Sequence, residues 1–177
     1  MRRARGLLPT LLLPMLLPTG CASDDAAADA RPAGTAVVVR PVDGDTIVVE
    51  IAGQEEAVRL IGIDTPESVA PDRPVECFGA EAKARTAELL PAGTVVRLER
   101  DVEPRDRYDR LLAYVFRASD DELVNLLLVE EGYAEARSYP PNVARQGELD
   151  RAEAEARAAG KGLWPACGGT DAPIGPG

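Results

Sequence analysis

Three short polar clusters interrupt the apolar segments of this chain, and they contain the residue types that can do chemistry. They are Asp43-Gly44-Asp45-Thr46, the segment from Arg59 to Glu67, and the segment from Asp106 to Arg110. Carboxylates can hold a hard cation or act as a general base, and arginines can bind phosphate oxygens through paired hydrogen bonds. Each cluster alone also has a simpler interpretation, because Asp-Gly favours a turn, Asp-Thr-Pro ends a strand, and charged loops are usually solvated.

The absence of histidine restricts the chemistry further. None of the 177 residues is a histidine, so a histidine base, nucleophile or metal ligand is excluded. Any reaction must therefore use carboxylates, arginines, tyrosines, a metal ion or water.

The apolar pattern around the clusters predicts five strands and three helices. Strands are expected at 35–40, 46–51, 57–63, 94–99 and 111–117, with turns at Asp43-Gly44 and Gly53-Gln54. Helices are expected at 80–90, from a cap at Asp120 or Asp121 through Glu131, and after Pro140-Pro141-Asn142 as far as Gly160. This order predicts an α+β, mainly β, fold and fits a five-stranded OB-fold barrel with three helices, although the pattern alone leaves a split α+β sheet equally open.

Together and in this order, the polar clusters resemble the staphylococcal nuclease (thermonuclease) family. The matching segments are Val42 to Thr46, Arg59 to Glu67, Asp106 to Arg110 with Leu112-Ala113-Tyr114, Val124-Asn125 with Gly132, and Gly162-Leu163-Trp164. They span residues 36–164, which is nearly the whole of the expected domain.

The resemblance implies a metal site and a catalytic set. Asp45 and Asp64 match the family's metal-binding carboxylates, with the backbone carbonyl of Thr65 as a further ligand. Oxygen ligands alone suit either calcium or magnesium, and the family uses Ca2+. Glu67 matches the proposed general base, which orients and deprotonates the attacking water.

Two arginines and two tyrosines complete the implied site. Arg59 and Arg110 match the arginines that grip the scissile phosphate, whose growing negative charge needs preorganised positive charge. Tyr108, Arg107 and Tyr139 are the expected substrate-binding residues, and stacking on a tyrosine tolerates any base. A second family tyrosine near Tyr139 is replaced by Arg137 or Ser138, which predicts altered base packing.

The resemblance implies a calcium-dependent phosphodiesterase that hydrolyses DNA and RNA and leaves 3′-phosphate products. A non-catalytic OB-fold module that binds nucleic acid or glycan, and a calcium-binding structural lipoprotein, are the alternatives. Net charge argues against nucleic-acid binding: without the three arginines of the leader, 17 basic residues face 30 acidic ones. We expect this charge to affect affinity and salt dependence more than catalysis, because a bound cation reverses the local field.

The first residues predict export. Residues 1–21 resemble a signal peptide, because a basic start precedes a leucine-rich stretch too short to span a bilayer. Leu17 to Cys21 resembles a lipobox, which predicts lipidation of Cys21 and a cell-surface lipoprotein, with a secreted protein as the alternative. Contact with a membrane is expected only through that lipid. A flexible tether at 22–34, a domain at 35–167 and a disordered tail at 168–177 should follow.

Two further cysteines, Cys77 and Cys167, predict a disulfide in an exported protein. It would close a loop of roughly 90 residues and stabilise the domain by ~4 kcal/mol. The alternative is a pair of free thiols. A monomer is expected, because no segment predicts an oligomer.

Overall fold

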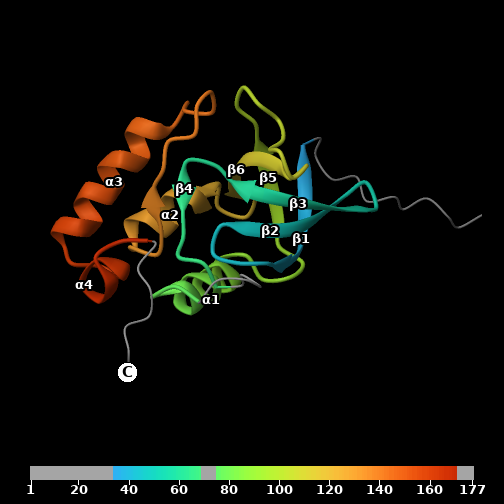
Figure 1. The fold of residues 1–177 in the computed structure, drawn as a ribbon. Helices are drawn as coiled ribbons and strands as arrows, with labels where there is room; N and C mark the ends of the chain where they lie inside the picture. Colours follow the sequence, from blue (N-terminus) through green and yellow to red (C-terminus); the bar gives the residue numbers. More distant parts are fainter. Residues whose placement is uncertain (1–33, 69–74, 171–177) are drawn as a thin grey trace, which may run out of the picture. The chain divides into compact units, whose positions relative to one another are not determined.

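The computed structural model describes residues 34–68 and 75–170. Their main feature is a sheet of strands that closes on itself, with helices on one side of it (Figure 1). The barrel strands are β1 (Thr35–Pro41), β2 (Thr46–Ile51), β3 (Gln54–Leu60), β5 (Val95–Glu99) and β6 (Leu111–Arg117). Three two-residue strands are β4 (Ile63–Asp64), β7 (Glu122–Leu123) and β8 (Glu135–Ala136). The helices are α1 (Gly79–Leu89), α2 (Val124–Glu130), α3 (Gln146–Ala158) and α4 (Leu163–Cys167).

Closure of the barrel depends on one parallel pairing. The sheet runs in the order β3-β2-β1-β5-β6-β7 through antiparallel neighbours, and β3 then pairs with β6 in parallel. Because the first and fifth barrel strands in this order meet, the sheet has no open edge along their paired residues. The predicted five-stranded OB-fold barrel is therefore confirmed, and the split sheet is excluded.

The β2–β3 turn lies one residue earlier than predicted. Ala52 and Gly53 both have positive φ, 51° and 78°, and Ile51 pairs directly with Gln54. Two central residues in that conformation form the type I′ turn that matches the twist of a hairpin. As a result β3 begins at Gln54, whereas Ala57 was expected.

The predicted strand 57–63 is broken near its end. Strand β3 stops at Leu60, and Gly62 at a φ of 79° turns the chain before β4 begins at Ile63. Strand β4 then pairs with β8 in a separate two-stranded sheet. This break directs the residues after Ile63 away from the barrel wall.

The helical prediction was right for α1 and α3 and wrong for the cap of α2. Helix α1 begins and ends within one residue of 80–90, and α3 ends two residues before Gly160. Neither Asp120 nor Asp121 caps α2: Asp121 lies in a turn with a φ of 57°, and Leu123 is the N-cap. Pairing of β7 with the end of β6 takes up Glu122 and Leu123, so the helix starts only at Val124. The short α4 is a fourth helix beyond the three expected.

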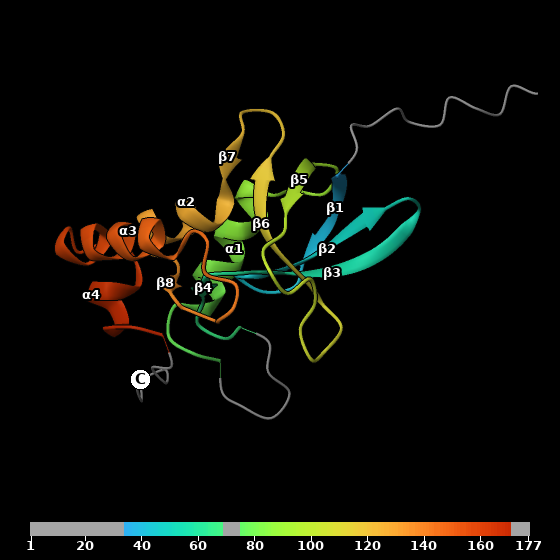
Figure 2. The same ribbon diagram turned by 90° about the horizontal axis from the view of Figure 1, so that it is seen from above.

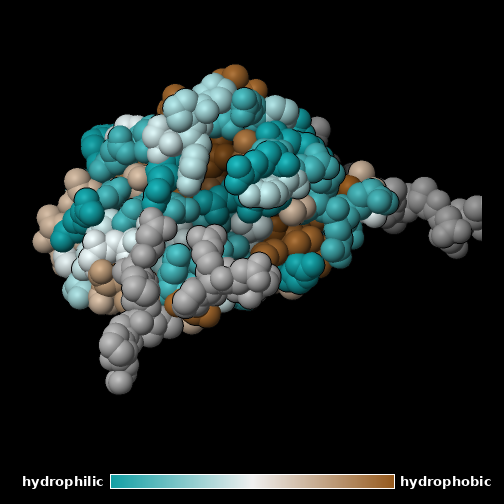
Figure 3. Space-filling view, viewed as in Figure 1, coloured by the Kyte–Doolittle hydropathy of each residue, from teal (hydrophilic) through white to brown (hydrophobic). Residues whose placement is uncertain are grey.

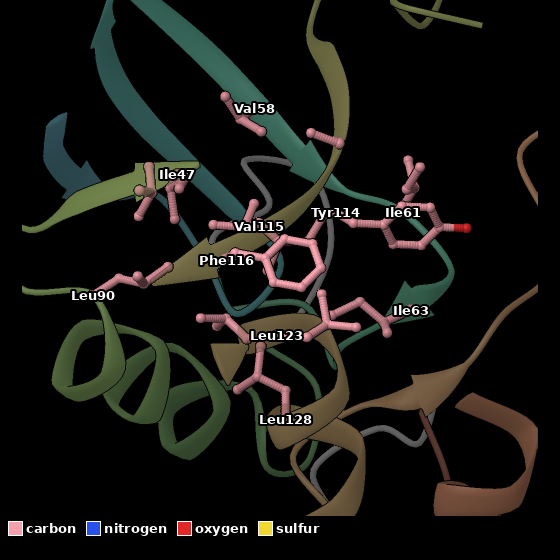
Figure 4. Close-up of a cluster of buried hydrophobic side chains, with 14 of the residues drawn as sticks. Ile47, Val58, Ile61, Ile63, Leu90, Tyr114, Val115, Phe116, Leu123 and Leu128 are labelled. Atoms are coloured by element: carbon pink, nitrogen blue, oxygen red, sulfur yellow. The ribbon is translucent and has the colours of Figure 1, made fainter. Parts of the chain in front are cut away.

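The core lies inside the barrel and between the barrel and the helices. The buried cluster includes Ile47, Val58 and Val115 from barrel strands, Leu90, which follows α1, and Leu128 of α2 (Figure 4). Seen from above, α1 and α2 lie next to the barrel strands and α3 lies alongside α2 (Figure 2). Burying one such aliphatic side chain stabilises the fold by roughly 1.5–3 kcal/mol.

The surface is mainly polar on the face drawn in Figure 3, where apolar residues form small separate patches between hydrophilic ones. Within the described part of the chain, no helix is both long enough and apolar enough to cross a bilayer. The predicted leader and Cys21 lie outside the described residues. Of the predicted tail, residues 168–170 are described, and the backbone N–H of Thr170 donates to Glu135 at 2.8 Å.

Candidate active site

Strand register brings the first two polar clusters together. Thr46 at the start of β2 pairs with Arg59 near the end of β3, and Arg59 pairs in turn with Leu112 of β6. Asp45 directly precedes Thr46, and Arg110 lies two residues before Leu112. Asp45, Arg59 and Arg110, which lie in or next to three different strands, thus converge at one end of the barrel.

Asp45 is buried and fully engaged. Its Oδ2 accepts hydrogen bonds from the backbone N–H and the hydroxyl of Thr65, each at 3.1 Å. Its Oδ1 accepts a bond from the Thr46 hydroxyl and also contacts the guanidinium of Arg59. These contacts fix the orientation of the carboxylate and join the first cluster to the second.

Gly44 permits that junction. A Cβ at this position would lie 2.6 Å from the Thr65 hydroxyl, closer than real side chains approach. The carbonyl of Gly44 also accepts a 2.6 Å bond from the buried hydroxyl of Thr86 in α1. The Asp-Gly turn therefore serves packing against Thr65 as well as chain reversal.

Asp64 lies between two arginines. Arg59 Nη2 donates to Asp64 Oδ1 at 2.8 Å, and Arg137 Nη2 pairs with Asp64 Oδ2 at 3.0 Å. Arg137 follows β8, the strand that pairs with β4 and so brings this arginine to the site. Of the two residues predicted to replace the family tyrosine, Arg137 is the one that the structure places against a predicted metal ligand.

Arg110 is held by Asp106 and lies beside Tyr108. Its Nε and Nη2 both reach Asp106 Oδ2 at 2.7 Å, and its Nη1 lies 3.4 Å from the Thr46 hydroxyl. Burial alone would raise the pKa of the Asp106 carboxyl, but hydrogen bonds from Arg110 and the backbone lower it overall. Asp106 therefore stays ionised and fixes the guanidinium at the mouth of the barrel.

Tyr108 lies in the loop before β6, like Arg110, and its side chain is exposed to solvent. Its ring is 64% exposed, its hydroxyl accepts a 2.6 Å bond from Arg107 Nη2, and the Arg107 guanidinium lies 4.7 Å from the ring centroid. Tyr139, 46% exposed, comes from the segment between β8 and α3. Both rings are therefore accessible for stacking.

Two connected hollows contain these residues. The inner pocket, of about 120 Å³, is lined by Asp43, Asp45, Arg59, Asp64, Thr65, Pro66, Glu67 and Glu76. The outer groove, of about 750 Å³, shares Asp43, Arg59, Asp64 and Glu67 with it and adds Arg107, Tyr108, Arg110 and Tyr139 among its lining residues. All nine residues predicted to bind metal, substrate or phosphate, or to act as base, thus line one continuous depression.

The remaining predicted site residues lie elsewhere. Cys77 and Cys167 are joined by a disulfide, with their Cα atoms 5.9 Å apart, and neither lines the inner pocket or the outer groove. Cys21 is outside the described residues.

The sequence did not predict the contribution of four residues that line the groove or pair with residues lining it. Asp43 was assigned to the turn only, and it does accept a bond from the Asp45 N–H, but it also lines both hollows. Burial raises the pKa of the Asp43 carboxyl, an effect that Arg59 partly opposes. The ion pairs of Asp106 with Arg110 and of Arg137 with Asp64, and any role for Glu76, were not foreseen, because these contacts exist only in the folded chain.

The donor set of the inner pocket fits a hard cation. Within residues 34–68 and 75–170, no three acidic or thiol side chains are arranged so that they enclose a metal ion. The predicted ligands are two carboxylates and a backbone carbonyl, so water would complete the roughly six to eight oxygens that calcium takes. Asp45 and Asp64 already face a common positive group, the Arg59 guanidinium, so both are oriented toward one point.

The fold and the site define an OB-fold protein whose groove combines carboxylates, arginines and exposed tyrosines. A family model described as staphylococcal nuclease homologue matches residues 57–166. The chain is 44% identical over 128 residues to a thermonuclease of Staphylococcus intermedius, covering 72% of this chain and 74% of that protein. It is 42% identical over 127 residues to a thermonuclease of Staphylococcus hyicus, covering 72% and 73%.

A third relative comes from another genus. Endonuclease YncB of Bacillus subtilis (strain 168) is 37% identical over 131 residues, which cover 73% of this chain and 61% of that protein. With the family match over more than half of its length, the chain belongs to the staphylococcal nuclease family.

Proposed function

We propose that the protein is a calcium-dependent nuclease that hydrolyses phosphodiester bonds in DNA and RNA. The observation that carries this proposal is the convergence of all nine predicted residues on one depression at the barrel end. The relatives named thermonuclease and endonuclease support the same reaction class. A binding module alone would need the exposed tyrosines and the arginines, but not a carboxylate such as Glu67 beside them.

The family resemblance suggests the roles of these residues, and their positions in the depression support them. Arg59 and Arg110 present guanidinium groups to the shared depression from β3 and from the loop before β6, where they can bind phosphate oxygens. Asp45, Asp64 and the carbonyl of Thr65 would hold the cation. When bound, calcium would neutralise charge on a phosphoryl oxygen and polarise the phosphorus–oxygen bond.

Glu67 is assigned as the general base. Its carboxylate accepts a proton from water while the water oxygen bonds to phosphorus and the bond to the 5′ oxygen breaks. The 5′ oxygen takes a proton from solvent, and the phosphate remains on the 3′ side. Preorganised guanidinium groups favour this step because charge develops on the phosphoryl oxygens as water adds.

Arg59 links cation binding to substrate binding. Its guanidinium contacts both Asp45 and Asp64, so it reaches a phosphate only by giving up part of these contacts. A cation that takes over the two carboxylates lowers this cost. We therefore expect calcium to tighten the binding of a nucleotide inhibitor, and the inhibitor to tighten the binding of calcium by the same factor.

The test is hydrolysis of single-stranded DNA and of RNA by the chain without its leader, with calcium and with a chelator. Glu67→Gln and Arg110→Ala should each lower kcat/KM by at least about a hundredfold. Glu155→Gln and Arg151→Ala, on the exposed face of α3, are the matched controls and should match the wild type. A folded wild-type chain that binds DNA without cutting it in calcium would instead identify a non-catalytic binding module.

Export is part of the proposal. A leader at residues 1–21, a lipid on Cys21 and a tether at 22–34 would place the enzyme on the cell surface. Mass spectrometry of the mature N-terminal peptide checks this directly. Recovery of the protein in the medium with an unmodified N-terminus would identify a secreted enzyme.

A further inference from the structure

Glu67 is joined to Glu76 by a pair of reciprocal hydrogen bonds. The backbone N–H of Glu67 donates to the side-chain Oε2 of Glu76 at 2.7 Å, and the backbone N–H of Glu76 donates to the carbonyl of Glu67 at 2.9 Å. One residue nine positions later in the chain thus holds both backbone polar groups of Glu67. We call these two bonds the Glu67–Glu76 clasp.

Glu76 itself is held in place by a disulfide at the next residue and by close packing of Gly79. Cys77, the next residue, is bonded to Cys167 at the end of α4. Gly79, the first residue of α1, lies so close to the Glu67 carbonyl that a Cβ there would be 2.6 Å from the oxygen. Its N–H also donates to the Glu76 carbonyl at 3.0 Å. Through these neighbours Glu76 is held against α1 and α4, and its two hydrogen bonds in turn hold the backbone of Glu67.

Glu67 needs such support because it lies in no helix or strand. The chain leaves β4 at Asp64 and passes through Thr65 and Pro66 before it reaches Glu67. Thr65 is held by Asp45, but that contact fixes the chain two residues upstream. A general base must be placed to within about an ångström of the reacting water, since a misplacement of that size can cost about a hundredfold in rate.

We propose that Glu76 is a positioning residue for Glu67, acting through the hydrogen bond from the Glu67 N–H and not through its charge. This inference rests on the proposed function, in which Glu67 is the base. Glu76 lines the inner pocket, so its charge is the competing explanation for any effect of its removal. The two explanations predict different results for a neutral side chain that keeps the acceptor oxygen.

The experiment compares Glu76→Ala with Glu76→Gln in saturating calcium. Alanine removes the acceptor, whereas glutamine keeps a carbonyl oxygen at the same distance along the side chain and removes the charge. We expect Glu76→Ala to lower kcat roughly ten- to a hundredfold with little change in KM, and Glu76→Gln to stay within about threefold of the wild type. Equal loss in both variants would show that the charge matters and would overturn the proposal.

A second readout does not depend on catalysis. Exchange of the Glu67 amide proton with solvent should be slow in the wild type and in Glu76→Gln. It should be faster in Glu76→Ala, because alanine removes the oxygen that accepts the hydrogen bond from this N–H. An amide proton that exchanges equally fast in all three proteins would overturn the proposal whatever the rates of cleavage.

The dependence on Glu67 is tested by a double-mutant cycle. If Glu76 acts through Glu67, Glu76→Ala should cost little further activity in a Glu67→Gln background. Additive losses would show that Glu76 acts elsewhere. If the wild type is active, Glu67→Gln is inactive and Glu76→Ala keeps full activity, this inference is wrong but the proposed function stands. If Glu67→Gln keeps full activity, Glu67 is not the base, and this inference is wrong as well.

Discussion

The disulfide between Cys77 and Cys167 should determine much of the stability of the domain. The two cysteines are 90 positions apart, and in the chain-entropy model a loop of that length stabilises the folded state by about 4.6 kcal/mol at 25 °C. Replacing both cysteines by alanine removes the cross-link without leaving a free thiol. A loss of 1 kcal/mol in the free energy of unfolding lowers Tm by about 4–8 °C in domains of 60–100 residues and by about 2–4 °C in domains of 150–250 residues. This domain lies between these sizes, so we expect its Tm to fall by roughly 10–20 °C.

The assay is thermal unfolding followed by circular dichroism, with the chain from residue 22 so that Cys21 is absent. Reductant should lower the Tm of the wild type toward that of the double variant and should leave the double variant unchanged. A double variant that melts within about 3 °C of the wild type would refute the loop-entropy argument, because such a shift corresponds to roughly 1 kcal/mol or less.

Four further predictions concern the core, the groove and the charge of the protein. Asn125 is fully buried and bonds two backbone groups of the barrel region at 2.9 Å each, so Asn125→Ala should lower the free energy of unfolding by about 2–4 kcal/mol in urea titrations. Gly44→Ala should displace Thr65 and lower kcat while circular dichroism stays unchanged. The Asp106 carboxyl has a pKa below its ordinary value of 3.8, so its contribution to stability is complete above that value and is lost as pH falls through the lower folded-state pKa. Urea titrations from pH 7 to pH 2 should therefore show the deficit of Asp106→Asn shrinking at the acidic end. Finally, log KM for single-stranded DNA should rise with log salt with a slope of about 2 or less, since each phosphate contact contributes about 0.7.

Four of the five barrel strands, β1, β2, β5 and β6, were predictable to within one residue because their signals are local. β-Branched runs and the Asp43-Gly44 turn located β1 and β2, and the β6 bounds were predicted without error. The closure of the barrel was not predictable from these signals, because it depends on parallel pairing of β3 with β6, whose paired residues, such as Val58 and Leu111, are 53 positions apart in the chain. Local propensity carries no information about that contact, so a split sheet was an equal alternative until the register was known.

The α2 cap shows how tertiary structure overrides a local signal. Aspartate before an apolar helix is a good N-cap, and Asp120 and Asp121 both fit this pattern. In the fold, the Asp120 carboxylate pairs with Arg117, and Asp121 adopts positive φ so that Glu122 and Leu123 can pair with β6. Pairing of two residues at the end of a buried strand thus displaced the helix start by several positions.

The residues of the candidate site were predictable from the family resemblance, but their partners were not. The resemblance assigns Arg59 and Arg110 to phosphate, and the structure adds that each is held by carboxylates: Arg59 by Asp45 and Asp64, and Arg110 by Asp106. These pairs join residues from separate strands and loops, so they depend on the barrel register. The motifs suggested roles for these residues, whereas the network of ion pairs that orients their side chains became visible only in the fold.

That network explains how an acidic protein can act on a polyanion. The chain has a formal charge of −10, yet the arginines of the groove, Arg59, Arg107 and Arg110, lie together at one end of the barrel. Two of them are paired with carboxylates, so a phosphate must compete for them, and long-range attraction contributes little. Binding should then depend on a few close contacts and on the cation, which is why a shallow salt slope is expected. A slope of 4 or more would require additional phosphate contacts outside the groove and would refute this account.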